Sequence, residues 1–121
     1  MSMKTHLETR ALFAGYNPAD NHGAVKPPIH PASTFVFPSA AIGAAHMETA
    51  YGVEGAETPP EGGFIYSRLG NPTLSVAETR LAAWDESEAA AVFSSGMSAI
   101  STTLFAWTGS ERALWYVGPL Y

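Results

Sequence analysis

The pattern of apolar and polar positions divides the chain into an irregular first half and a regular second half. Leu7–Phe13 has the composition of a short helix, and turn-forming residues follow it as far as Pro38. Residues 39–50 are rich in alanine and begin with Ser39, a good N-cap, so they predict a helix. Residues 51–63 show no period and predict a loop. Residues 1–38 therefore predict an arm that cannot form a core by itself and lies over another surface.

A capped helix opens the second half. Asn71 is a good N-cap, and Pro72 occupies the first helical position, where its missing N–H costs nothing. The helix is predicted to run to about Trp84. Four apolar residues recur in it at helical spacing and form one stripe, namely Leu74, Ala77, Leu81 and Trp84.

A strand, a tight turn and a further helix follow. Residues 89–93 form an apolar run, residues 94–96 predict a turn, and residues 97–107 have a helical composition. Residues 113–117 predict a second strand. This order predicts a βαβ unit, with parallel strands and a right-handed crossover. Because two strands do not make a stable sheet, we expect the front part of a larger protein, or a module that needs a partner.

Composition and charge narrow the classes of function. The 121 residues fit one domain, and 46% of them are hydrophobic, as in folded proteins. A net charge of −5 without a basic patch argues against nucleic acid and anionic membranes as partners. The sequence has no cysteine, and its four histidines lack metal-ligand spacing, so we expect no disulfide and no metal site. No secretory signal or membrane-length apolar run is seen, which favours a cytoplasmic protein.

Three groups of residues can carry chemistry. Ser95, Gly96 and Met97 lie at a predicted helix N-terminus, whose free N–H groups bind anions, although an ordinary strand-to-helix turn has the same sequence. Tyr66 and Arg68 share one face of an extended segment, and arginine holds phosphate or carboxylate at two points. The alternative is an exposed arginine without such a role. Tyr121 follows the last predicted strand and can stack on a flat heterocycle, or serve as a core or surface tyrosine.

Four motifs in register resemble one enzyme family. They are Pro28-Ile29 leading to residues 33–37, Tyr66-Ser67-Arg68 followed by Asn71-Pro72-Thr73, residues 95–100, and Gly118-Pro119-Leu120-Tyr121. In this order and spacing the chain resembles the cystathionine γ-synthase, cystathionine γ-lyase and methionine γ-lyase family. These are pyridoxal-phosphate enzymes of sulfur amino-acid metabolism. The loop of residues 51–63 is longer than the methionine γ-lyase pattern.

The resemblance implies an α/β fold of the aspartate-aminotransferase type (fold type I). Its large domain has three layers, α/β/α, around a mostly parallel sheet. Residues 1–63 would then be an N-terminal arm, short helix and loop that pack on other subunits. Residues 64–121 would begin the pyridoxal-phosphate-binding large domain.

The resemblance also implies a role for each candidate residue. Gly96 and Met97, with Ser95 beside them, would bind the cofactor phosphate. Tyr66 and Arg68 would reach the phosphate in the neighbouring subunit of a homotetramer, a dimer of dimers. Tyr121 would stack on the pyridine ring and assist proton transfer as the catalytic residue of this segment.

The implied activity is γ-elimination or γ-replacement on methionine, cystathionine or O-acylhomoserine, as a lyase or a synthase. In the family the Schiff-base lysine and the aspartate that pairs with the pyridine nitrogen lie beyond residue 121, so we expect the 121-residue segment alone to be inactive. The alternative is a short non-catalytic module that binds a partner subunit or a phosphate.

Overall fold

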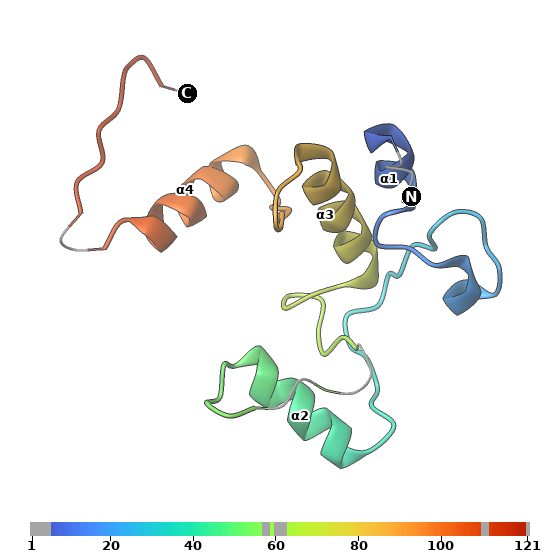
Figure 1. Ribbon diagram of the computed structural model, residues 1–121. Coiled ribbons are helices and arrows are strands. Elements are labelled where there is room, and N and C mark those ends of the chain that lie inside the picture. Colours follow the sequence, from blue (N-terminus) through green and yellow to red (C-terminus); the bar gives the residue numbers. More distant parts are fainter. Residues whose placement is uncertain (1–5, 57–58, 60–62, 110–111, 121) are drawn as a thin grey trace. The chain divides into compact units, whose positions relative to one another are not determined.

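The described part of the chain is helical. The computed structural model describes residues 6–56, 59, 63–109 and 112–120. These residues form α1 (Leu7–Phe13), the 3-10 helix η1 (Pro18–Asn21), α2 (Ala40–Ala50), α3 (Pro72–Asp85) and α4 (Gly96–Trp107), as Figure 1 shows. None of the helices in these residues is long and apolar enough to cross a membrane.

The chain forms two compact units. Met1–Ala90 contains α1, η1, α2 and α3, and Ala91–Tyr121 contains α4. The division predicted from the family, between an arm of residues 1–63 and a large domain from residue 64, concerns the assembled enzyme and stays a prediction.

Each of the three longer helices begins at a side chain that caps it. Ser39, Asn71 and Ser95 each accept a hydrogen bond from a backbone N–H two or three residues later, at 2.9–3.3 Å. This satisfies one of the N–H groups that a first helical turn leaves without a partner. The caps predicted at Ser39 and Asn71 are confirmed, and α4 begins one residue before its predicted start.

In the first unit, α1 packs on α3 through a close approach at Gly15. A Cβ atom added to Gly15 would lie 2.7 Å from the Cβ of Thr79, and Gly15 has a φ of +69°. Both facts favour glycine, which has no Cβ and adopts positive φ without strain. Arg80 adds a polar contact, because its Nε donates to the carbonyl oxygen of Ala14 at 3.4 Å.

The predicted apolar stripe of α3 is not covered by the described residues. The α3 residues that line a groove with Leu12 and Phe13 of α1 are Thr73, Val76, Ala77 and Arg80. By contrast, Leu81 and Trp84 are 52% and 55% exposed. No apolar side chain among the described residues is buried, and the only side chains buried there are those of His46 and Asn71. The expectation that residues 1–38 have no core of their own agrees with this result for the described residues.

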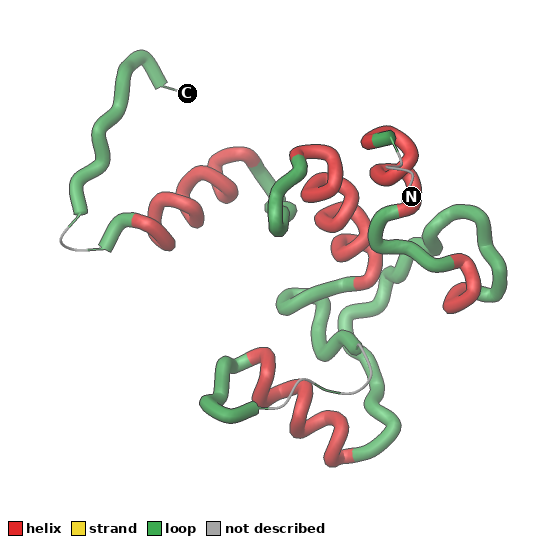
Figure 2. The backbone as a smooth tube through the Cα atoms, in the orientation of Figure 1, coloured by secondary structure: helices red, strands yellow, loops and turns green. Residues whose placement is uncertain are grey.

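The two predicted strands are not formed within the part of the chain that the structure describes. Residues 89–93 and 113–117 have no strand assignment there, and Figure 2 shows these segments as loops. A strand is stable only beside another strand, and no strand is assigned to the described residues. Strand-like pairing within the described residues is limited to an isolated antiparallel β-bridge between Thr34 and Tyr66. The predicted parallel βαβ pair is therefore absent from the described residues.

Candidate functional site

The segment from Tyr66 to Arg68 lies against the N-terminal arm. Phe35 N donates to the carbonyl oxygen of Ile65 at 3.3 Å, and Ser67 N donates to the carbonyl oxygen of Ser33 at 2.9 Å. These bonds flank the bridge between Thr34 and Tyr66. The extended arm, which lacks a core, thus finds its hydrogen-bonding partner in the predicted phosphate-binding segment.

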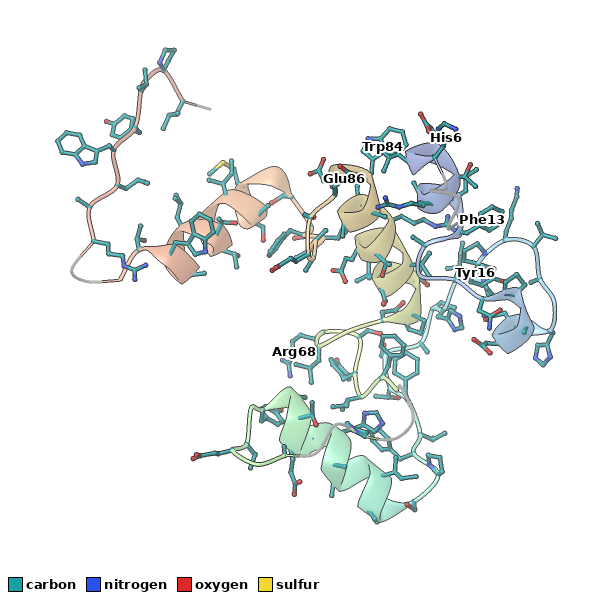
Figure 3. All side chains as sticks on the ribbon, viewed as in Figure 1. His6, Phe13, Tyr16, Arg68, Trp84 and Glu86 are labelled. Atoms are coloured by element: carbon teal, nitrogen blue, oxygen red, sulfur yellow. The ribbon has the colours of Figure 1, made fainter. Side chains whose placement is uncertain are left out.

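Tyr66 and Arg68 lie together at a turn. The turn is closed by Leu69 N, which donates to the carbonyl oxygen of Tyr66 at 2.8 Å, and the Ser67 hydroxyl within it donates to the carbonyl oxygen of Ala32 in the arm. The sequence predicted an extended segment here, and the structure has a turn instead. The Arg68 guanidinium carbon lies 5.4 Å from the centroid of the Tyr66 ring, within the range of a cation–π contact. Figure 3 shows Arg68 on the loop that precedes α3.

The Arg68 guanidinium is available to an external anion. The residue is exposed, Tyr66 is 40% exposed, and no carboxylate among the described residues forms an ion pair with Arg68. Arginine presents its N–H groups in a planar fork that matches phosphate and carboxylate. This exposed pair can therefore bind a phosphate in two ways, through the tyrosine hydroxyl and through the arginine fork.

The N-terminus of α4 offers backbone donors. Ser98 N bonds to Ser95 Oγ, and Ala99 N bonds to the carbonyl oxygen of Ser95. The N–H groups of Gly96 and Met97 precede the helical bonding pattern and have no intrahelical acceptor. Ser95 keeps its O–H as a donor, because its Oγ only accepts in the cap.

The space beside these donors is open. A Cβ added to Gly96 would meet no atom within 4 Å, and Met97 is 48% exposed. Gly96 is not among the residues of positive φ, so its backbone conformation does not require glycine. Two free N–H groups at the positive end of a 12-residue helix, beside an uncrowded glycine, fit the phosphate of pyridoxal phosphate.

The predicted site residues fall into two groups. Tyr66 and Arg68 belong to the unit Met1–Ala90, and Ser95, Gly96 and Met97 belong to the unit Ala91–Tyr121. The structure brings together the members of each group. Tyr121 lies outside the described residues, and its role stays a prediction.

Sequence reasoning missed the packing of His46. This histidine is 9% exposed, and its ring stacks on Phe37 with 5.3 Å between centroids. A Cβ added to Gly63 would lie 2.9 Å from His46 Nε2. His46 therefore joins α2 to the residues on both sides of it. The signal in the sequence was Gly63, a glycine immediately before Phe64 that allows this close approach.

The comparison with known proteins decides the family. The sequence model of Cys/Met metabolism PLP-dependent enzymes matches residues 8–116. The chain belongs to this family. Membership confirms the resemblance seen in the four motifs, and with it pyridoxal 5′-phosphate as the cofactor of the family and fold type I as its architecture.

The similar curated proteins are lyases and synthases. The chain is 43% identical to an L-methionine gamma-lyase of Pseudomonas deceptionensis over 102 residues, which are 84% of this chain and 23% of that enzyme. It is 42% identical to an L-methionine gamma-lyase of Pseudomonas putida over 100 residues, 83% of this chain and 22% of that enzyme. It is also 42% identical to a cystathionine gamma-synthase of Mycobacterium tuberculosis over 96 residues, 79% of this chain and 20% of that enzyme. The chain thus spans less than a quarter of the length of these relatives.

Proposed function

We propose that this chain supplies the phosphate-binding N-terminal part of a pyridoxal-phosphate enzyme that carries out γ-elimination or γ-replacement on a sulfur amino acid. The observation that carries the proposal is the pair of exposed anion-binding groups, Arg68 beside Tyr66 and the free N–H groups of α4, in a chain of this family. Substrates of this class are methionine, cystathionine and O-acylhomoserine.

The residues of this chain would hold and orient the cofactor. Gly96 and Met97 donate backbone N–H groups to its phosphate, Ser95 donates its hydroxyl, and Arg68 and Tyr66 add a charged fork and a phenol. Tyr121 stacks on the pyridine ring and moves a proton. When bound, pyridoxal phosphate supplies an electron sink for carbanion chemistry at the substrate. The parallel sheet of the fold type I large domain belongs to this proposal, with residues 89–93 and 113–117 as two of its strands.

The test is the Arg68→Ala substitution in the full-length protein, with cofactor affinity measured by titration of the apoprotein. Loss of a charged hydrogen bond costs about 1.5–3 kcal/mol, so affinity should fall roughly 10- to 150-fold. Arg10→Ala is the matched control, because Arg10 is an arginine of the same unit that pairs with Glu86 at 3.7 Å. An unchanged cofactor affinity in Arg68→Ala would remove Arg68 from the site.

The proposed oligomer gives a second test. If Tyr66 and Arg68 act on the neighbouring subunit's phosphate, a hybrid of Arg68→Ala subunits with Gly96→Pro subunits regains one intact site per dimer. At a cofactor concentration that loads the wild-type protein but neither variant, random mixing of the two homodimers in equal amounts should then restore about a quarter of wild-type activity, because half the dimers are hybrids. No recovery on mixing would show that Arg68 acts within its own subunit.

Assays of the full-length protein with the three substrates distinguish the remaining alternatives. Release of a 2-oxo acid from methionine indicates a lyase, and formation of a new thioether from O-acylhomoserine and a thiol indicates a synthase. A protein that binds phosphate and a partner subunit but turns over none of the three would be the non-catalytic module instead.

A further inference from the structure

A polar network that the sequence analysis did not assign holds the segment Tyr66–Ser67–Arg68 in place. Its centre is Asn71, which is 8% exposed and is one of the two buried side chains among the described residues. The cap that Asn71 provides for α3 uses only its Oδ1, which accepts from Thr73 N at 2.9 Å. The amide Nδ2 of Asn71 faces the other way, toward the arm and Ser67.

The donors of this amide are matched by acceptors from two segments. Asn71 Nδ2 lies 3.1 Å from the carbonyl oxygen of His30 and 3.0 Å from Ser67 Oγ. It also lies 3.5 Å from the carbonyl oxygen of Ala32, at the edge of hydrogen-bonding distance. An amide has two N–H donors, and the two shorter contacts use both of them. The buried side chain is thus fully satisfied only when the arm and Ser67 are both in place.

Ser67 connects Asn71 to the arm by hydrogen bonds. Its hydroxyl donates to the carbonyl oxygen of Ala32 while its Oγ accepts from Asn71. The bonds run in one direction, from the Asn71 amide through the Ser67 hydroxyl to the arm. A second link lies beside them, because His30 N donates to Thr73 Oγ1 at 2.9 Å.

The position of Ser67 decides where its neighbours point. Ser67 lies between Tyr66 and Arg68 in a turn that is closed by Leu69 N, which donates to the carbonyl oxygen of Tyr66 at 2.8 Å. Anchoring the Ser67 hydroxyl on the arm therefore holds this turn in place. It also holds the contact that leaves the Arg68 guanidinium carbon 5.4 Å from the Tyr66 ring centroid. Preorganised donors lose less freedom when they bind a ligand.

We propose that Ser67 and Asn71 are positioning residues for phosphate binding. They fix the direction of Tyr66 and Arg68 and do not touch the ligand themselves. The inference rests on the proposed function, because it assumes that Tyr66 and Arg68 bind the cofactor phosphate.

Two substitutions in the full-length protein test this role. Ser67→Ala removes the middle of the chain of bonds and leaves the α3 cap whole. Asn71→Asp keeps an oxygen for the cap but loses both donors. The matched controls are Ser39→Ala, which removes a side-chain bond to a backbone N–H at α2, and Asn17→Ala, which removes the cap of η1. If Asn71→Asp does not fold, Ser67→Ala decides the question.

The measurement compares the affinities of the apoprotein for pyridoxal phosphate and for pyridoxal, which lacks the phosphate. A positioning role lowers affinity for pyridoxal phosphate about tenfold in both variants and leaves affinity for pyridoxal within twofold of wild type. In the double variant Ser67→Ala with Arg68→Ala, the Ser67 effect should be smaller than in the single variant, because only Tyr66 is left to position. The controls should change neither affinity.

Three results would overturn the inference. They are an unchanged affinity for pyridoxal phosphate in folded Ser67→Ala, an equal loss for both compounds, and an effect that simply adds to that of Arg68→Ala. The outcome is separate from the test of the proposed function. If Arg68→Ala alone has no effect, the assignment of Arg68 fails, whereas an effect of Arg68→Ala without one of Ser67→Ala rejects only the positioning role.

Discussion

The two candidate phosphate-binding groups are held by different kinds of contact. In the segment around Tyr66, the side-chain hydrogen bonds join residues 35, 41 and 43 positions apart, through Ser67, Asn71 and Thr73. At α4, from Ser95 onward, the side-chain bonds span three to five positions. The first group is therefore built by tertiary contact and the second by the local sequence of one helix.

This difference shows how each group can be damaged. A helix N-terminus needs only its own first turn to expose free N–H groups. The segment of Tyr66 and Arg68 needs the arm and the start of α3, because the arm and Asn71 supply its hydrogen-bonding partners. Substitutions far from Arg68 should therefore impair the group of Tyr66 and Arg68 and leave the N-terminus of α4 intact.

The largest effect is expected at Gly15, where α1 meets α3. Gly15→Ala introduces a side chain at a φ of +69° and a Cβ 2.7 Å from Thr79. Positive φ costs about 1–2 kcal/mol for alanine, and overpacking adds typically 1–3 kcal/mol. The free energy of unfolding, measured in urea, should fall by the sum, about 2–5 kcal/mol.

Gly23→Ala is the matched control, because Gly23 has a φ of +79° and nothing within 4 Å of an added Cβ. Its free energy of unfolding should fall only by the cost of positive φ, about 1–2 kcal/mol. Equal losses at Gly15 and Gly23 would mean that the contact with Thr79 does not constrain the first unit.

The next effect is expected at the start of α4. Gly96→Pro removes one of the two proposed phosphate donors, yet proline suits the first helical position and Ser95 already has the extended backbone that precedes proline well. Helix content by circular dichroism should be unchanged, and affinity for pyridoxal phosphate should fall by about 1.5–3 kcal/mol. A loss of helix content together with affinity would show a structural role for Gly96 instead of a donor role.

The smallest effect is expected at the caps. Ser95→Ala and Ser39→Ala each remove one side-chain acceptor from a helix start, at a cost of about 1 kcal/mol. Thermal unfolding should therefore shift similarly in the two variants. Only Ser95→Ala should also weaken binding of pyridoxal phosphate, because Ser95 is a proposed ligand of its phosphate. Equal cofactor affinities in the two variants would contradict that assignment.

Much of the candidate site could be predicted from the sequence. The caps at Ser39 and Asn71 and the start of α4 were predicted because an N-cap acts on N–H groups two or three residues away. The two-residue period of an extended chain predicted that Tyr66 and Arg68 share a face. The two side chains do meet, but at a turn and not on an extended segment. The motifs that contain these residues also identified the family.

Contacts between distant segments could not be predicted in this way. The amide of Asn71 meets the carbonyl oxygen of His30 only after the arm has folded back, and no local pattern predicts which acceptor it would meet. The same holds for the approach of Gly15 to Thr79. The predicted strands have a related explanation, since a strand is stable only beside another strand and no such pair is formed in the described residues.

The sequence alone thus determined α2, α3 and α4 to within one residue at each end, the helix N-terminus at Gly96 and Met97, and the family. These depend on hydrogen bonds and capping within a few residues of chain. The tertiary structure alone decided that Ser67 faces the arm and that Asn71 joins the arm, Ser67 and α3. Those contacts depend on loop closure over more than 30 residues, for which local periodicity carries no information.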